Sequence, residues 1–237
     1  YTTLFRSGHQ AMDVPQVHIY ADLQPQGNVL PVHTAKVIAD YTKGMWNLTD
    51  KPNWIGEFGV INNPSVEDQD YYPELFHNAI WAALGAGSAM TPAEWNDFNT
   101  WGTMTSDMKR HMSYLSDFVE LLPLAELNPE PLIIDSSNDN IRGWGVSGEQ
   151  GGLVWIQDYA LEGKGIEQIR TNRSLRTGAS IEISGLSSGK YKVHPFNTWI
   201  GQFEPSFDVL CETTLNSSCT VLLPEFTADI AIRLERL

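Results

Sequence analysis

Basic residues are scarce in this sequence. Its 237 residues include 15 lysines and arginines against 29 aspartates and glutamates, which gives a formal net charge of −14. A surface with that excess of negative charge repels a phosphate backbone, so we expect no nucleic-acid partner. Long apolar runs are also missing. No stretch approaches the roughly 18 apolar residues that cross a bilayer, so we expect no membrane partner either.

The common metal and nucleotide motifs are absent. His9, His18 and His33 lack ligand spacing, and no HExxH, paired CxxC or EF-hand loop occurs. There is no P-loop. GWGVSG (143–148) and GLSSG (185–189) match the GxGxxG and GxSxG spacings, but both lie among strand-like runs, where a turn is the simpler interpretation than a dinucleotide fingerprint or a nucleophile elbow. We therefore expect neither a metal nor an organic cofactor. The 42% of hydrophobic residues nevertheless suffices for a packed core.

Cysteine is limited to Cys211 and Cys219, which flank the polar, turn-like stretch ETTLNSS. The strand-like runs SFDVL and TVLLP lie outside them, so the two cysteines could face each other across a hairpin. We expect a disulfide there; two buried free thiols are the alternative. The chain starts at Tyr1 without an initiator methionine, so either a leader has been removed or the sequence is a piece of a longer protein. We expect a secreted or periplasmic protein.

The first half of the chain alternates strand and helix patterns. Residues 14–21 and 53–60 read as strands, and 31–45, 72–87 and 105–124 carry helical apolar stripes. A short apolar piece, SAMTP, follows the second helix. Such alternation predicts βα units with a parallel sheet.

The second half, after the proline-rich linker NPEP at 128–131, changes to about eight short strands separated by Gly, Ser and Asn turns. That pattern is typical of an antiparallel β-sandwich. The sequence thus predicts two domains, an α/β module over 1–127 and an all-β module over 128–237.

Three features point to chemistry. Glu57 ends an apolar strand between Gly56 and Gly59, where a carboxylate is poorly explained by packing; a structural ion pair is the alternative. His18 and Tyr20 are two residues apart on the preceding strand, so they share a face and could hydrogen-bond to a sugar or to a carboxylate. In isolation the pair would more simply be core residues.

Aromatic side chains gather after SAMTP, at Trp95, Phe98 and Trp101. Exposed aromatic rings stack on sugar faces, although tryptophan is also ordinary core filler. Trp95 is the candidate for substrate binding in this group.

The order of these motifs, HIY, then WIGEFG, HNAIWAALGAG and TPAEW, resembles the second half of a retaining glycoside hydrolase. The relevant group is the clan of (β/α)8-barrel enzymes that includes cellulases and mannanases. The resemblance implies a partial barrel of about three βα units, with Glu57 as catalytic nucleophile and His18, Tyr20 and Trp95 as substrate-binding residues. GKYKVHPFNTWIGQF and VLLPEFTADIAIRLE similarly resemble the small β-sandwich appended to some of these hydrolases.

The resemblance implies an oligo- or polysaccharide substrate, but the sequence departs from the clan in one respect. The clan's acid/base follows an asparagine, and no Asn-Glu dipeptide occurs here. Three accounts stay open: the chain is a fragment, two copies complete one barrel as a homodimer, or Asp13, Asp22 or Glu94 substitutes. The alternative function is a non-catalytic carbohydrate-binding or adhesion module with a relic barrel.

Overall fold

The computed structural model describes residues 13–23, 25, 28–49, 51–60, 71–95, 104–120, 122, 124–212 and 218–237. The chain divides into two compact units. Unit 1 comprises Tyr1–Arg110 and Leu161–Thr171, and unit 2 comprises His111–Ala160 and Asn172–Leu237. The boundary predicted near residue 127 stays a prediction. The chain enters unit 2 at His111, leaves it after Ala160 and returns to it at Asn172.

Unit 1 is built from alternating strands and helices. Its elements are β1 (Gln16–Ile19), the short 3-10 helix η1 (Ala21–Leu23), α2 (Pro31–Leu48), β2 (Trp54–Phe58), α3 (Tyr72–Gly85), the start of α4 (Ser106–Val119) and nearly all of α6 (Ile166–Asn172). β1 and β2 pair in parallel. This confirms the expected mixed α/β organisation, and the helices end within a few residues of their predicted limits.

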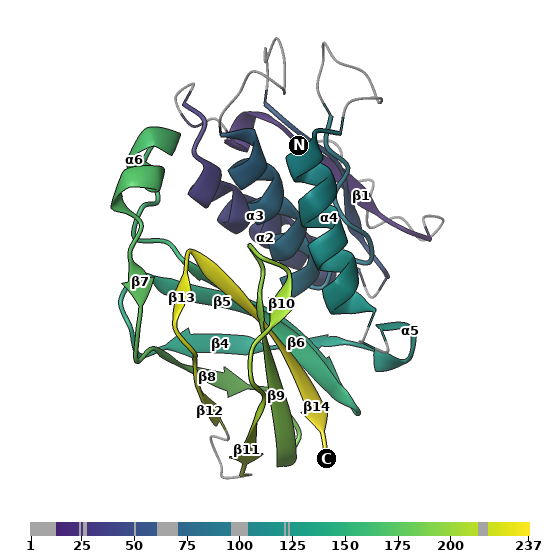
Figure 1. Ribbon diagram of the computed structural model, residues 1–237. Coiled ribbons are helices and arrows are strands. Elements are labelled where there is room, and N and C mark those ends of the chain that lie inside the picture. The colour runs from purple at the N-terminus through teal and green to yellow at the C-terminus, as the bar shows by residue number, and fades with distance from the viewer. Residues whose placement is uncertain are drawn as a thin grey trace. The chain divides into compact units, whose positions relative to one another are not determined.

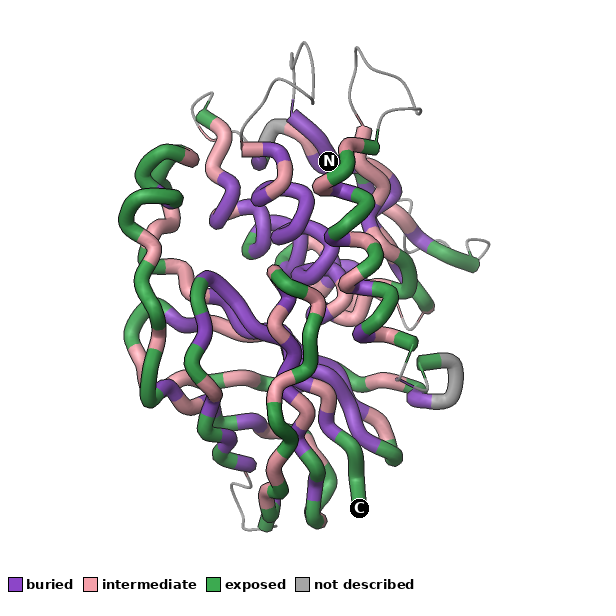
Figure 2. Tube along the Cα trace, in the orientation of Figure 1, coloured by how far each residue is buried: buried purple, intermediate pink, exposed green. Residues whose placement is uncertain are grey.

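Helices α2 and α3 pack against each other, as Figure 1 shows, and α2 also contacts β2. Pro31 opens α2 at a position where a missing N–H costs nothing. Almost every residue of α3 is buried, including Leu75, Ile80 and Trp81 (Figure 2). A helix that is buried on nearly all sides in this way belongs to the interior of its unit.

Unit 2 is rich in strands, and its short elements separate into three sheets. The elements are the remainder of α4, α5 (Leu124–Leu127), β3 (Glu130–Pro131), β4 (Ile133–Ser136), β5 (Ile141–Gly148), β6 (Gly151–Asp158), β7 (Leu175–Arg176), β8 (Ser180–Ser184), β9 (Gly189–Asn197), β10 (Gln202–Phe203), β11 (Phe207–Cys211), β12 (Ser218–Leu222), β13 (Phe226–Thr227) and β14 (Asp229–Arg236). Every strand pair in unit 2 is antiparallel.

The largest sheet of unit 2 runs β10–β9–β14–β6–β5–β3 with β11 also paired to β9, and a second runs β12–β8–β4. Side chains of both sheets meet in one hydrophobic core, in which Val154 and Ile232 come from the first and Ile181 and Val221 from the second. Each of these four residues is fully buried. The alternation in SIEIS and DIAIRL therefore points the apolar side chains into this core.

Cys211 and Cys219 are joined by a disulfide in the structure. Their strands are not partners in a hairpin, because β11 pairs with β9 and β12 pairs with β8. The bond therefore links the two main sheets of unit 2 rather than two neighbouring strands. The hairpin expected from the sequence is wrong, since the strands that contain the two cysteines belong to different sheets.

The NPEP segment and the helices remain to be compared with what the sequence predicts. The NPEP segment, expected as a linker, contributes β3, which pairs with Val146 and Ser147 of β5. Within the residues that the structure describes, no helix is long and apolar enough to span a membrane.

Candidate active site

The candidate site lies on one face of the parallel strands β1 and β2. His18 is paired with Glu57 across the sheet, and Ile19 is paired with Phe58. Val17, Ile19, Ile55 and Phe58 are buried, and the ring of Phe58 lies 6.3 Å from that of Phe76 in α3. The sheet thus has a helix-facing side and an opposite side, and His18 and Glu57 lie on the opposite side.

A shift in register sets the direction of Glu57. Val17 is paired with Ile55, but His18 is paired with Glu57, so Gly56 is an extra residue on β2. Simple alternation from the buried Ile55 would turn Glu57 toward the helices. The extra residue reverses this and places the carboxylate beside His18, which is how β-bulges near functional sites redirect a side chain.

Both sequence-predicted partners contact the same oxygen of Glu57. The hydroxyl of Tyr20 donates a hydrogen bond to Oε2, and Nδ1 of His18 lies 3.1 Å from that atom. The side chains of His18 and Glu57 are 42% and 27% exposed. Among the described residues no hydrogen bond reaches Oε1, so this oxygen is the one available to a ligand.

The two glycines beside Glu57 make room for neighbouring groups. A Cβ on Gly56 would stand 2.1 Å from Oε1 of Gln16 and 3.1 Å from Nε2 of His18. A Cβ on Gly59 would stand 2.0 Å from the carbonyl oxygen of Trp95 and 3.4 Å from the ring of Tyr20. The space that the two glycines leave is therefore occupied in part by other groups of the protein.

A third extended segment continues the sheet beside β2. The amide of Ala89 donates to the carbonyl of Asn53, that of Phe58 to Ala93, and that of Trp95 to Phe58. Phe58 and Glu94 form a parallel bridge. The SAMTP piece and its continuation thus occupy the strand position that follows β2.

Glu94 faces the helices rather than the candidate site. A residue bridged to Phe58 in a parallel pair shares its side of the sheet, and the hydroxyl of Tyr72, the first residue of α3, donates to Oε1 of Glu94. Burial raises the pKa of Glu94, an effect that the Tyr72 hydrogen bond partly offsets. Burial first, and then the neighbouring Glu94, raises the pKa of Tyr72.

The other two carboxylates considered as substitutes for the acid/base are also placed elsewhere. Asp13 is exposed and precedes β1, at the strand end opposite to Tyr20. Asp22 follows β1, where its Oδ2 accepts a hydrogen bond of 2.5 Å from the hydroxyl of Tyr41 in α2. The structure therefore brings together Glu57, His18 and Tyr20, and the hydrogen bonds of Asp22 and Glu94 go to Tyr41 and Tyr72 instead.

Trp95 is half-buried, and what ties it to the site is its backbone, through Phe58 and the space at Gly59. Its predicted role as a sugar platform stays a prediction. Phe98 and Trp101 lie outside the described residues. No group of three or more potential metal ligands occurs among the residues that the structure describes.

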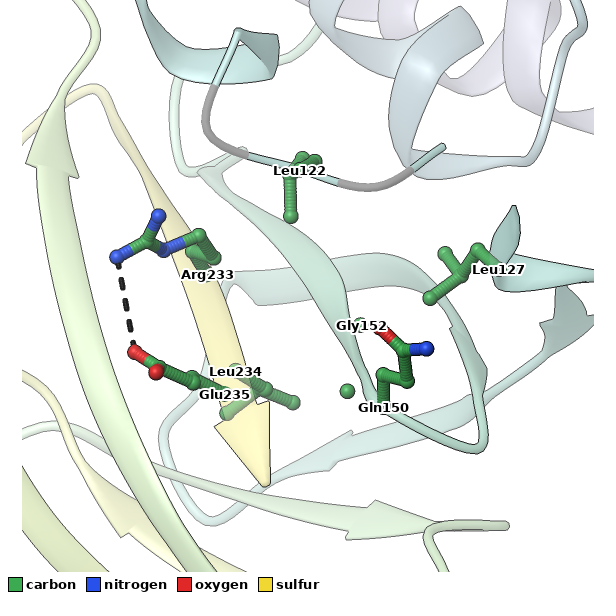
Figure 3. A pocket seen from close by; sticks show the side chains of 8 residues that line it. Leu122, Leu127, Gln150, Gly152, Arg233, Leu234 and Glu235 are labelled. Carbon is green, nitrogen blue, oxygen red and sulfur yellow. Dashed lines mark ion pairs between the residues drawn. The ribbon is translucent and has the colours of Figure 1, made fainter. Parts of the chain in front are cut away.

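A separate hollow of about 280 Å³ lies in unit 2, between the segment of Leu122 and Leu127 and strand β14 (Figure 3). Arg233 and Glu235 line it and form an ion pair of 3.8 Å. None of the sequence-predicted catalytic or substrate-binding residues belongs to this hollow.

Sequence reasoning missed two residues of the site, Gly56 as the extra residue and Tyr72 as the partner of Glu94. A signal for the first was present, since Ile55 and Phe58 are three positions apart, and an apolar pair on one face of a regular strand needs an even spacing. The sequence held no such signal for Tyr72, because its contact with Glu94 depends on how α3 lies against the sheet.

No protein-family model and no curated protein sequence matches the chain. Solved structures to which it is similar include a glycoside hydrolase, at 15% identity and a TM-score of 0.47 over 84% of this chain and 46% of that one. Another is a glycoside hydrolase family 5 protein from Bacteroides vulgatus, at 14% identity and a TM-score of 0.45 over 84% and 45%. A third is a GH30 endoxylanase from Clostridium papyrosolvens, at 12% identity and a TM-score of 0.42 over 98% and 52%. The chain spans about half the length of these proteins.

Proposed function

We propose that this chain carries the nucleophile half of a retaining glycoside hydrolase acting on β-linked glycans. The observation that carries the proposal is the carboxylate of Glu57, whose Oε2 is held by Tyr20 and His18 while no hydrogen bond from the described residues reaches Oε1. A nucleophilic carboxylate needs this asymmetry, because one oxygen must be oriented and the other must reach the anomeric carbon.

In the proposed reaction Oε1 of Glu57 attacks the anomeric carbon, and the bond to the leaving oxygen breaks with its electron pair. The result is a glycosyl ester on Glu57, which water then hydrolyses. Two carboxyl groups about 5–5.5 Å apart normally share this work, the second donating a proton to the leaving oxygen and later activating the water. The described residues supply the first group, together with its two orienting donors.

We assign the second carboxyl to a further stretch of polypeptide that completes the barrel. β1 pairs with β2 on one side, and no strand in the described part of the chain pairs with its other side. An open edge of this kind has unpaired backbone groups that accept another strand. A further barrel segment or a second copy of the chain would meet that need. In this proposal unit 2 is the appended β-sandwich, and the protein is secreted or periplasmic.

The test uses a leaving group that departs without a proton. A 2,4-dinitrophenyl β-glycoside lets Glu57 react even where the acid is absent, and the covalent intermediate is detected as a mass increase on the peptide that contains Glu57. We expect labelling of the wild-type chain and none of Glu57→Gln. Asp40→Asn is the matched control, because Asp40 is an exposed carboxylate of α2 in the same unit that pairs with Lys36.

The dependence of the rate on the leaving group then tests the second carboxyl. If the isolated chain lacks the acid, rates should fall steeply from dinitrophenyl to nitrophenyl and unactivated glycosides, and addition of the completing segment should flatten this dependence. Saccharide binding without any labelling would instead favour a carbohydrate-binding module.

A further inference from the structure

Glu94 and Tyr72 lie behind the sheet, on the side away from Glu57, and the proposed reaction does not use them. Tyr72 is 1% exposed, and its hydroxyl donates a hydrogen bond to the carboxyl of Glu94. The backbone of Glu94 forms a parallel bridge with Phe58, the residue after Glu57. A hydrogen bond between a buried tyrosine and a half-buried carboxyl 22 residues apart holds their two segments in one relative position.

The segment that the Tyr72–Glu94 hydrogen bond holds, residues 93–95, also contacts the strand that contains Glu57. Glu94 stands between Ala93, whose carbonyl accepts from the amide of Phe58, and Trp95, whose amide donates to the carbonyl of Phe58. The next carbonyl, that of Trp95, occupies the space above Gly59. The ring of Tyr20 borders the same space, since it would lie 3.4 Å from a Cβ on Gly59.

A chain of contacts therefore runs from α3 to the candidate nucleophile. Tyr72 holds Glu94, Glu94 fixes the backbone of Trp95 against Gly59, and this backbone and the ring of Tyr20 border the same small space. Tyr20 in turn donates to Oε2 of Glu57. If the 93–95 segment moved away from Gly59, the ring of Tyr20 would gain freedom and its hydroxyl would orient the carboxylate less well.

We infer that Glu94 and Tyr72 are a positioning pair, which fixes the 93–95 segment and through it the orientation of Tyr20 at the Glu57 carboxylate. The inference rests on the proposed function and deepens it by naming two residues that govern the reaction without touching the substrate. Small displacements at a reacting group cost a large part of its rate, which is why such a pair matters.

The experiment compares Glu94→Ala and Tyr72→Phe, which remove the hydrogen bond, with Glu94→Gln, which keeps an acceptor oxygen opposite Tyr72. One readout is the rate of glycosyl transfer to Glu57 from the dinitrophenyl glycoside at saturating concentration. We expect a fall of about tenfold in the first two variants and a change of less than about twofold in Glu94→Gln.

The second readout needs no substrate. The ring-proton resonances of His18, measured by nuclear magnetic resonance, report the surroundings of Oε2 of Glu57. They should move in Glu94→Ala and Tyr72→Phe and stay near the wild-type positions in Glu94→Gln. If the wild-type chain forms no glycosyl ester, the proposed function fails, and these resonances alone decide the positioning role.

Asn78→Ala separates positioning from a general loss of stability. Asn78 lies in the same helix as Tyr72 and donates a buried hydrogen bond of 2.9 Å to the carbonyl of Pro31. This variant should lose stability but keep the rate and the His18 resonances. Unchanged resonances and rate in Glu94→Ala would overturn the inference, as would an equal loss in Asn78→Ala or in Glu94→Gln.

Discussion

The carboxylate of Glu57 is held through one of its two oxygens. Both His18, within β1, and Tyr20, the residue after its end, contact Oε2. Because the two side chains are only two residues apart, their spacing is fixed by a short piece of backbone. The orientation of the carboxylate is therefore established before any ligand arrives, which is the condition for efficient nucleophilic catalysis.

Glu94 gives the folded protein a specific pH dependence. Its pKa is raised by burial, so the folded state keeps this proton at a pH at which the unfolded chain has lost it. Between the ordinary carboxyl pKa and the raised one, the free energy of unfolding must fall as the pH rises. Glu94→Gln has no proton to lose and should lack this fall in urea unfolding measured over a pH series.

Tyr72→Phe provides the complementary variant. The Tyr72 hydrogen bond lowers the pKa of Glu94 against the larger effect of burial. Its removal should extend the fall in stability to a higher pH. Identical pH profiles in wild type and Glu94→Gln would contradict the assignment of this dependence to Glu94.

Asp229 is the corresponding buried carboxylate of unit 2. It is 2% exposed, and it accepts hydrogen bonds from Nε1 of Trp155 (3.0 Å), Nε1 of Trp199 (2.6 Å) and the hydroxyl of Thr198. Asp229→Ala would leave these donors buried without their acceptor. We expect a loss of about 3–5 kcal/mol in the free energy of unfolding, measured with urea.

Asp208→Ala is the control for this prediction. Asp208 is exposed on β11, where it pairs with Lys190 at 2.6 Å, and its loss should cost far less. Equal losses in the two variants would show that the three donors of Asp229 find other partners.

The hydrogen bonds of Asp229 also give a physical reason for the NTW and FTADIA motifs in this sequence, since they supply Thr198, Trp199 and Asp229.

At the scale of elements, the extra residue Gly56 in β2 decides which way Glu57 points.

Gly59, just after β2, is the glycine whose replacement should damage the candidate site most. In Gly59→Ala the new Cβ would meet the backbone carbonyl of Trp95 at 2.0 Å. We expect a loss of about 1–3 kcal/mol in stability, together with a lower rate of glycosyl transfer. Gly56→Ala should cost less, since its nearest atom belongs to the movable end of Gln16.

Gly44→Ala is the matched control for these two substitutions. Gly44 lies within α2, and no atom stands within 4 Å of its Cβ position. Alanine there should stabilise the protein by about 0.5–1 kcal/mol, because glycine is a poor helix former. If Gly59→Ala behaved like Gly44→Ala, the close packing of Trp95 on Gly59 would be refuted.

The disulfide between Cys211 and Cys219 joins β11 of one sheet to β12 of the other. Reduction should lower the stability of unit 2 by about 2–3 kcal/mol, because the bond restricts the unfolded chain. Thermal unfolding with and without a reductant measures the effect. A melting transition that does not move under reductant would count against a stabilising bond.

Much of the element pattern could be predicted from the sequence. The stripes at α2, α3 and α4 and the alternation of β8 and β14 reflect local periodicity, which a single chain segment already contains. Sheet membership could not be predicted in the same way. Cys211 and Cys219 are close in sequence, yet their strands pair with β9 and β8, and that choice depends on the packing of distant side chains.

The candidate site could likewise be predicted only in part from the sequence. His18, Tyr20 and Glu57 could be selected from their residue types and their positions on neighbouring strands. The face of Glu57 could not be derived from alternation alone, because the extra Gly56 reverses it. The helix-facing direction of Glu94, which removes it as a substitute acid, follows from its bridge to Phe58 and was not visible in the spacing.

At the scale of the whole molecule, the proposed function assigns one of two catalytic carboxyl groups to this chain. The described part of the chain gives Glu57 its two orienting donors and a positioning pair, and it leaves one edge of β1 unpaired. The net charge of −14 disfavours a phosphate-bearing ligand.

The central claim is that Glu57 forms a covalent bond to the anomeric carbon of a β-glycoside. Mass spectrometry of the wild-type chain after incubation with a 2,4-dinitrophenyl β-glycoside tests it most directly. We expect one added glycosyl unit on the Glu57 peptide of the wild type, its absence from Glu57→Gln and its retention in Asp40→Asn. Labelling of Glu57→Gln to the same extent, or no labelling of the wild-type chain by any of a panel of such glycosides, would contradict it.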